Sequence, residues 1–352
     1  MQAMWHSPAV GGCRELIGEM LNIMMQSEIE LKSLSRFRSE LMGAAIVFIM
    51  LFHTPLESDA CLFGLYRMGN VGVDIFLFLS GIGLWFSWVK TPSMGYFFRK
   101  RLLRIFPTWI IISSIYFLTH FDWDGATVTD YFKLVGDILV DWSFWRSHEL
   151  TFWFVPAIVG FYVLAPFYMK LIQRHPIYRW LPALMLVLCV FLQWVQPVFN
   201  YVWGYEVAWS RMPIFFIGIN CGELVRRNGR IEPAGRWLVY ATFVFTLALC
   251  IYLELMDQTN FPMFIERLVY IPMSISLMLL LTDLYNRMPT WSLRTLAFIG
   301  AITLELYLVH EHFVLEWLTP MNLSYWPTAG LNIALSIPLA WMLKQVTKRI
   351  PM

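Results

Sequence analysis

Charged residues are scarce in this chain. Asp, Glu, Lys and Arg together make up only 14% of its 352 residues, whereas 58% are hydrophobic. A soluble domain usually carries about 25% charged residues and 45–50% apolar ones. So little charge cannot cover the surface of a water-soluble domain, and that class of protein is excluded. We therefore expect lipid to be the solvent for most of the chain.

Paired cysteines and the short motifs of metal or nucleotide chemistry are also missing. No CxxC, HExxH, P-loop or GxGxxG occurs, which argues against a zinc site or a nucleotide-binding fold of those types. The net charge is only +2, and no basic run is interleaved with aromatics as nucleic acid would require. We expect no metal, no nucleic-acid partner and no disulfide framework among the five cysteines, Cys13, Cys61, Cys189, Cys221 and Cys250.

Long apolar runs are what the sequence does have. A helix that spans a bilayer needs roughly 17–25 apolar residues, and loops are marked by polar residues, Pro or Gly. The runs are continuous rather than alternating, which favours helices over a membrane barrel. The sequence therefore predicts an all-α, polytopic membrane helix bundle with about ten transmembrane helices, at 40–56, 70–89, 103–120, 151–170, 180–198, 210–225, 236–255, 266–284, 295–315 and 327–346.

The positions of basic residues predict the orientation of these helices. If both termini are cytoplasmic, every inner segment is basic, as the positive-inside rule requires. We therefore predict cytoplasmic termini and a multi-pass protein of the inner (cytoplasmic) membrane, whose oligomeric state the sequence leaves open. Of the 26 Lys and Arg residues, this topology leaves only five outside: Arg67, Lys133, Arg146, Arg211 and Arg267.

Two segments differ from the spans. Residues 1–35 are less apolar and are interpreted as an N-terminal cytoplasmic segment, either disordered or upstream of the true start, so the transmembrane domain is assigned to 36–352. The outer segment 120–150 is rich in aspartate, and the spacing of Lys133, Leu134 and Ile138 predicts a short amphipathic helix on the outer surface.

His53 and Asp74 stand near the outer ends of the first two predicted helices. An ionisable group at membrane depth is a candidate functional residue, and histidine can exchange a proton near neutral pH. His53 is therefore either a general base or an interfacial residue among headgroups. Asp74 either orients that histidine or caps its own helix. Nearby, Ser80 and Gly81 favour close helix packing, and a serine nucleophile is the less favoured interpretation.

The ninth predicted helix carries an unusual polar load. Glu305 lies near its middle and needs a partner or a neutral form, and His310 lies toward the outside. Both are candidate catalytic residues, whereas Glu311 and His312 suit an interfacial position. Arg211 either grips a polar acceptor, pairs with Glu305 or extends its charge to water at the rim.

A basic cluster opens the third predicted helix. In FFRKRLLRIFP, Arg101 and Arg104 are three residues apart and share a helix face, with Arg99 close by. Such a pair can clamp phosphates. The alternative is anchoring against anionic lipid, which explains most clusters of this kind.

The chain resembles the membrane acyltransferase-3 family over roughly residues 36 to 346. Six segments carry the resemblance in the family's order: RSELMGAAIVFIMLFH, GVDIFLFLSGIGLWFS, FFRKRLLRIFP, TFWFVPAIVGFYVLAPFY, RMPIFFIGINCG and FIGAITLELYLVH. The resemblance implies transfer of an acyl group, usually acetyl from acetyl-CoA, to hydroxyls of extracytoplasmic glycans. It maps the family's first-helix histidine to His53 and its basic motif to Arg101 and Arg104.

One position departs from the family's pattern. Many members have Arg or Lys eleven residues before the histidine, where this chain has Met42. Either Arg38, about one turn earlier, takes that role, or this branch does without it. The resemblance thus implies an O-acyltransferase acting on O-antigen, capsule or exopolysaccharide, with acetyl-CoA bound near Arg38, Arg99, Arg101 and Arg104. The alternatives are a transporter or flippase of a lipid-linked sugar and a catalytically inactive relative in a glycan-assembly complex.

Overall fold

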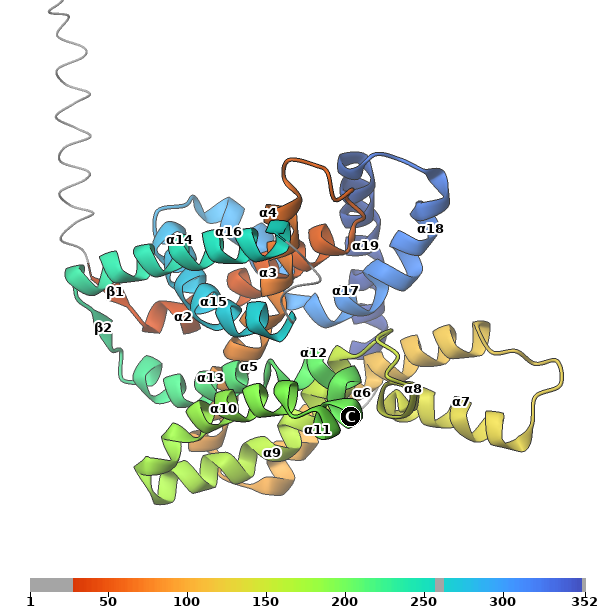
Figure 1. The fold of residues 1–352 in the computed structure, drawn as a ribbon, viewed down its shortest axis with the longest axis horizontal. Helices are drawn as coiled ribbons and strands as arrows, with labels where there is room; N and C mark the ends of the chain where they lie inside the picture. The colour runs from red at the N-terminus through yellow and green to blue at the C-terminus, as the bar shows by residue number, and fades with distance from the viewer. Residues whose placement is uncertain (1–27, 257–262, 350–352) are drawn as a thin grey trace, which may run out of the picture.

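The computed structural model describes residues 28–256 and 263–349 (Figure 1). Within these ranges the only strands are β1 (Ile29–Glu30) and β2 (Arg230–Ile231), which pair antiparallel, and the all-α prediction is confirmed. Of the predicted N-terminal segment, residues 1–27 lie outside the described residues. The rest of that segment forms β1 and most of α2 (Lys32–Arg36).

Six helical stretches among the described residues are long and apolar enough to cross a membrane. A seventh is counted if α16 (Thr290–Ala301) and the stretch Thr303–Met321, bent by 63° from it, form one broken span. The chain is thus a multi-pass membrane protein, and ten spans with cytoplasmic termini remain predictions. The six are Phe63–Lys90, which joins α4 (Phe63–Arg67) to α5 (Val71–Lys90), α6 (Met94–Thr119), α9 (Phe154–Arg174), Pro176–Trp194 with α10 (Leu181–Trp194), and the apolar parts of α14 (Pro233–Met256) and α15 (Met263–Tyr285).

Three more predicted runs are helices that fall short of those limits. α3 (Arg38–His53) has 16 residues and α13 (Met212–Arg226) has 15, whereas α19 (Tyr325–Lys348) has 24 but is less apolar. All ten predicted runs therefore overlap helices. Fewer than ten helices meet both limits because α3 and α13 are too short and α19 is less apolar.

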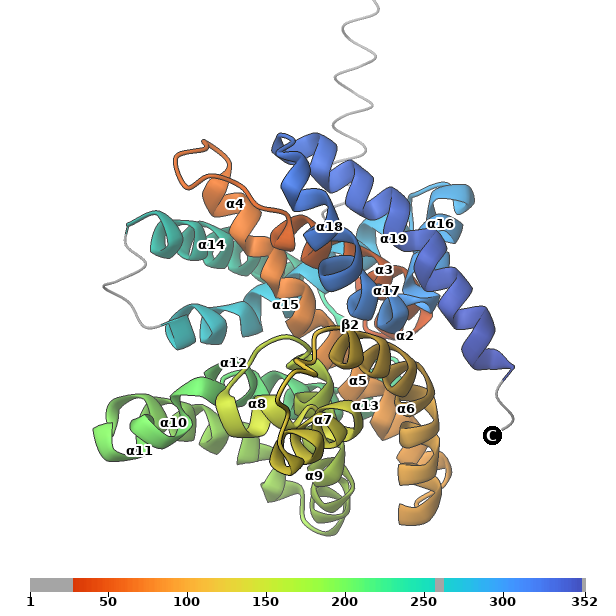
Figure 2. The ribbon, with the colours of Figure 1, turned by 90° about the vertical axis from the view of Figure 1, so that its right-hand side faces the viewer.

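Glycines let the central helices approach closely. A Cβ added at Gly43 of α3 would lie 2.1 Å from the Leu296 carbonyl oxygen of α16, and one at Gly218 of α13 would lie 2.3 Å from the Phe78 carbonyl oxygen of α5. Gly81 faces α13 in the same way, as its sequence context predicted. Small residues of this kind are typical of helix contacts in membranes. They place α3 and α5 in the middle of the molecule, where both views show them (Figures 1 and 2).

The aspartate-rich segment after α6 folds into two short helices. α7 (Val128–Val140) begins with a capping box between Thr127 and Asp130, which satisfies two free N–H groups at its start. The helix that the sequence predicts in this segment is confirmed. α8 (Trp142–Ser147) follows, and the pair projects at the end of the longest axis opposite β1 and β2 (Figure 1).

Two further segments complete the chain. Short helices α11 (Gln196–Val202) and α12 (Glu206–Trp209) connect α10 to α13. After α16, the chain continues through α17 (Thr303–Val309), a π-helical turn η4 (His310–Leu315) and α18 (Glu316–Leu318). The bend before α17 directs η4 toward the end of α3.

Candidate functional site

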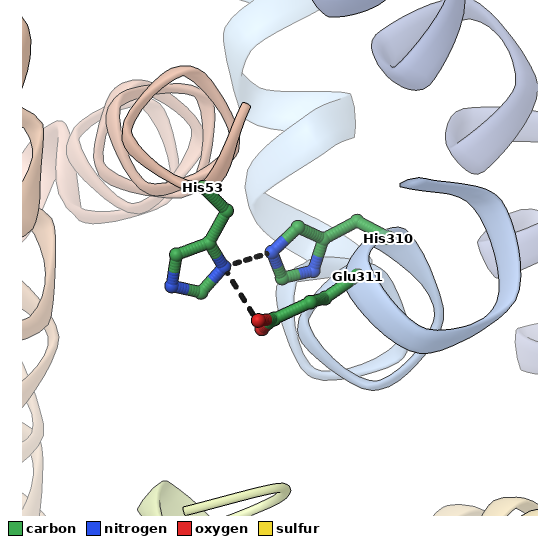
Figure 3. Close-up of side chains that lie close together, drawn as sticks. All are labelled: His53, His310 and Glu311. Atoms are coloured by element: carbon green, nitrogen blue, oxygen red, sulfur yellow. Dashed lines mark hydrogen bonds and ion pairs between the residues drawn. The ribbon is translucent and has the colours of Figure 1, made fainter. Parts of the chain in front are cut away.

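His53, the last residue of α3, meets two side chains of η4. Its Nδ1 lies 2.8 Å from Nε2 of His310 and 3.1 Å from Oε2 of Glu311 (Figure 3). The two imidazole rings are nearly parallel, with centroids 5.0 Å apart. Residues 257 positions apart in the chain thus form one polar centre, and single π-helical turns such as η4 are frequent at functional sites.

The contacts of His310 fix where its proton lies. Its Nδ1 is 2.9 Å from the Leu306 carbonyl oxygen and 3.0 Å from that of Tyr307, and carbonyl oxygens only accept hydrogen bonds. Nδ1 therefore carries the proton, and Nε2 of the neutral ring is an acceptor. His53 Nδ1 then donates to both His310 Nε2 and Glu311. Consequently the proton-free nitrogen of His53 is Nε2, which points away from both partners (Figure 3).

This arrangement suits a general base. A base needs a free lone pair, a fixed orientation and a group that stabilises its cation. His53 is partly exposed, so a substrate can reach it, while His310 is fully buried and rigidly held. The Glu311 carboxylate lies within ion-pair distance once His53 gains a proton.

The same three side chains are the one group of potential metal ligands found among the described residues. Their donor atoms lie within 4.8 Å of one another, and His310 has the backbone-bonded Nδ1 common in metal-binding histidines. However, ligand atoms around a tetrahedral zinc at about 2.0–2.1 Å are more than 3 Å apart. The 2.8 Å separation of the two imidazole nitrogens fits a hydrogen bond better than shared coordination.

A second polar centre lies at the other end of α3. Arg38 and Arg101 are each largely buried, interact electrostatically with Arg104, and have an Nε atom with no hydrogen-bond partner. The Arg38 guanidinium reaches α5, where its carbon would lie 3.2 Å from a Cβ added at Gly83. Arg99 is exposed on the surface of α6. Buried guanidinium groups with unused donors are suited to a polyanion such as a diphosphate.

The position of Arg38 bears on the basic residue that this chain lacks at Met42. Arg38 lies fifteen residues before His53, which is about 22 Å along a helix. It therefore belongs to the arginine cluster and not to the histidine centre, whose partners come from η4. Met42 itself is buried and apolar.

A small cavity is lined by residues that lie near both centres. Its volume is about 80 Å³, and it is lined by Arg104 and Ser80 as well as by Met42, Ile49 and Tyr307. Ile49 is one turn before His53, and the Tyr307 ring contacts that of His310 with centroids 6.3 Å apart. Most other lining residues are apolar: Val73, Phe76, Ile105, Phe154, Val155, Ile158 and Leu304, with Tyr162 and Thr303 the exceptions.

Asp74 and Arg211 have different partners from those expected. Asp74 does not hold His53 but accepts a hydrogen bond at 3.3 Å from Nε of Arg211, and both side chains are fully buried. Arg211 also donates to Asn70 and to the Val207 carbonyl oxygen. Arg211 therefore does not lie at the rim, where it could bind an acceptor. A buried guanidinium must be paired to offset its lost hydration, and these bonds provide the pairing. The pair joins α5 to the start of α13.

Glu305 is likewise paired elsewhere. Its Oε1 accepts a hydrogen bond from Lys344 Nζ at 2.9 Å and lies 3.5 Å from the Thr108 hydroxyl. The pairing of Glu305 with Arg211, one of the predicted alternatives, is therefore wrong. Glu305 thus links α17 to α19 and α6, and the structure does not bring it into the histidine centre. Glu311, set aside as interfacial from the sequence, is the residue that the structure does bring there. Its signal was the unbroken run His310-Glu311-His312 within an apolar helix.

Comparisons with known proteins give one match. Neither the search of curated proteins nor that of solved structures found a similar chain. A family model described as an acyltransferase domain matches residues 43–344, which include the histidine centre, Arg101, Arg104 and every residue that lines the small cavity except Met42. The match covers most of the chain, and the protein therefore belongs to the acyltransferase-3 family.

Proposed function

We propose that this protein is a membrane O-acyltransferase that moves an acetyl group from cytoplasmic acetyl-CoA to a hydroxyl of an extracytoplasmic glycan. The observation that carries the proposal is an apolar cavity that Arg104 of the arginine cluster lines together with Ile49 and Tyr307, which lie next to the oriented histidine pair. A donor with a phosphorylated head and an acyl tail matches that order of chemistry. Family membership supports the acyl transfer itself.

The arginine cluster would hold the phosphates of CoA. Arg38 and Arg101 have unused buried donors, and Arg104 adds a third charge at the mouth of the cavity. Charge-assisted bonds from arginine to phosphate are among the strongest hydrogen bonds in proteins. With the head fixed there, the pantetheine arm would extend toward His53, and the side chains that line the cavity would move apart to admit it.

The size of the cavity favours a short acyl group. A volume of about 80 Å³ is close to that of roughly three water molecules in the liquid. Phe76, Phe154 and Met42 close it from several sides. An acetyl group fits such a space without repacking, whereas a long fatty acyl chain does not.

At the histidine centre, the transfer would follow general base catalysis. His53 Nε2 takes the proton of the acceptor hydroxyl while the hydroxyl oxygen attacks the thioester carbonyl carbon. Glu311 stabilises the resulting imidazolium, and His310 keeps the ring in place. The carbon–sulfur bond then breaks, His53 returns the proton to the CoA sulfur, and the ester remains on the glycan.

The test is transfer of labelled acetyl from acetyl-CoA by purified protein in lipid nanodiscs, with release of free CoA measured in parallel. His53→Ala should lower both signals by about 100-fold or more, since it removes the base. His175→Ala, an exposed histidine at the end of α9, is the matched control and should retain the wild-type rate. Full activity of His53→Ala would overturn the catalytic assignment. No turnover of any acyl-CoA by the wild type would favour the transporter or inactive-relative alternatives.

A further inference from the structure

A second and larger cavity lies beside α7 and α8. It has a volume of about 510 Å³, within the range of small-molecule sites. Its walls come from the end of α6, the loop that follows, α7 and the segment after α8. None of its lining residues belongs to the proposed donor path. The cavity is therefore a separate space on the molecule.

Two residues that line this cavity also contact η4, the turn that carries His310 and Glu311. Tyr116 and Thr151 line it, and both contact His312, the neighbour of Glu311. His312 Nε2 lies 2.8 Å from the Thr151 carbonyl oxygen, and its ring centroid is 5.1 Å from that of Tyr116. The cavity is thus bordered by residues that contact the same turn, η4, whose Glu311 meets His53.

The lining combines aromatic faces with carboxylates. Tyr116, Phe117 and Phe121 supply rings, which pack against the apolar faces of a sugar ring. Exposed Asp122, Asp124 and Glu149 supply oxygens that accept hydrogen bonds from hydroxyl groups. The lining is more polar than that of most small-molecule sites, which suits a ligand rich in hydroxyl groups.

The charged side chains that line the cavity are mostly negative. Five carboxylates line it against one lysine, and that lysine, Lys133, is bound to Asp130 at 2.7 Å. The Lys133 contact holds the pKa of Asp130 below its ordinary value, so Asp130 stays ionised. A carboxylate or phosphate on a ligand would therefore meet like charges, which disfavours its binding.

We infer that this cavity binds the acceptor and selects a sugar residue without a negative charge. The inference rests on the proposed function and adds the acceptor's place and chemical class. Its hydroxyls are held by the carboxylates of the 120–150 segment, its ring lies on the aromatic side chains, and one hydroxyl reaches His53 past the Tyr116–His312 wall. Uronic-acid, sialic-acid and phosphate-bearing residues are rejected by the carboxylates.

The first experiment identifies the ester that the protein adds. Surface glycans of cells with and without the gene are compared by mass spectrometry and NMR. We expect the lost ester to stand on a neutral or amino sugar residue. An ester on a residue that itself carries a carboxylate or phosphate overturns the inference while leaving the proposed function intact. No lost ester, together with no acetyl-CoA turnover, overturns the proposed function and the inference with it.

The second experiment tests the cavity directly in the deletion strain. Asp124→Lys and Phe121→Ala are each returned as the full chain, with Asp59→Lys as the matched control. Asp59 is an exposed carboxylate in the 54–62 loop that does not line the cavity. The cavity variants should lower glycan ester content by roughly tenfold, and by a larger factor than they lower acetyl-CoA hydrolysis by the purified proteins. The control should retain both signals.

Three results would overturn the inference in this second experiment. Ester content unchanged in both cavity variants would place the acceptor elsewhere. An equal loss of ester and acetyl-CoA hydrolysis would mean that the substitutions damage the fold or the donor site. Restoration of ester by added Ca²⁺ or Mg²⁺ alone would assign the carboxylates to a cation instead of a sugar.

Discussion

At His53 the important quantity is the position of one proton. The backbone carbonyl oxygens of Leu306 and Tyr307 determine the tautomer of His310, and His310 in turn determines that of His53. The tautomer of His53, the proposed base, is therefore determined by groups two hydrogen bonds away. Glu311 adds the negative charge that a protonated His53 requires.

Glu311→Gln should separate the charge from the hydrogen bond. The amide can still accept from His53 Nδ1 but cannot stabilise the imidazolium, so we expect kcat to fall by roughly 100-fold with little change in KM for acetyl-CoA. Glu316→Gln, an exposed glutamate that contacts His312, serves as the control. Steady-state kinetics with labelled acetyl-CoA measure both. Similar rates in the two variants would remove Glu311 from the mechanism.

Arg101→Met should act on donor binding instead of on chemistry. It replaces a buried guanidinium whose Nε has no partner in the protein by a side chain of similar length. We expect KM for acetyl-CoA to rise about tenfold with kcat nearly unchanged, because a phosphate contact is equal in ground and transition states. Lys90→Met, an exposed change on the same predicted side, should leave KM as it is. A large fall in kcat alone would contradict the assignment.

Part of this site could be predicted from the sequence. His53, His310 and the arginines stand out because ionisable groups are rare in apolar helices. Glu311 does not, because consecutive residues of an α-helix point about 100° apart, and the sequence does not show that the chain forms a π-helical turn at His310–Leu315. The Asp74–Arg211 pair was missed for another reason. Its members are 137 residues apart, and no local pattern reports such a contact.

At the scale of elements, the contact between α3 and α16 depends on two glycines. A Cβ at Gly300 would lie 1.8 Å from the Ser39 carbonyl oxygen, and backbone cannot move away as a side chain can. The opposing Gly43 is equally close to α16. The contact holds α3, which ends in His53, against the broken helix that carries His310.

Gly300→Ala should therefore destabilise the protein although alanine favours helices. We expect a loss of about 1–3 kcal/mol, visible as a lower Tm in detergent, because the added methyl group overpacks a closed interface. Gly330→Ala in α19 is the matched control, since no atom lies within 4 Å of its added Cβ. That change should leave Tm unchanged or raise it slightly. Equal Tm values for both variants would mean that the helices separate at no cost.

Asp141, between α7 and α8, should make the stability of this pair depend on pH. Burial raises its pKa to about 7 from an ordinary value near 4, although the Ser143 hydroxyl donates to it at 2.9 Å. A raised pKa means that the folded state prefers the protonated carboxyl. The stabilisation is complete below pH 4 and is lost as pH rises to about 7.

Asp141→Asn should remove this dependence. The amide stays neutral, and Asn tolerates the left-handed backbone at this position, where φ is 52°. We expect the variant to resist proteolysis of the α7–α8 segment better than the wild type at pH 8 and equally at pH 4. Limited proteolysis in nanodiscs at the two pH values measures this. A larger difference at pH 4 than at pH 8 would contradict the assignment.

The elements themselves were well predicted where hydrophobicity decides them. Every apolar run overlaps a helix, and α7 was anticipated from its amphipathic spacing. The 63° bend between α16 and α17 was not, because the run 295–315 is apolar on both sides of it. Hydrophobicity shows which residues prefer lipid. The bend is instead set by contacts with α3 and α19, which lie elsewhere in the chain.

At the scale of the whole molecule, the two polar centres lie at opposite ends of α3. The arginine cluster faces the predicted cytoplasmic side, and His53 together with the larger cavity faces the predicted outer side. A hydrocarbon layer is about 30 Å thick. Arg38 and His53, at the two ends of α3, are about 22 Å apart along that helix, which is less than the thickness of the hydrocarbon layer.

Cysteine labelling tests this orientation. Among the described cysteines, Cys61 is exposed and lies in the 54–62 loop after His53, whereas Cys189 and Cys250 are buried. In a variant that keeps only Cys61, an impermeant maleimide should label intact cells, because the loop is predicted outside. With Cys61 also replaced, Pro92→Cys in the exposed α5–α6 loop should be labelled only after permeabilisation. The reverse pattern would place the arginine cluster outside, away from cytoplasmic acetyl-CoA, and would contradict both the predicted topology and the proposed donor.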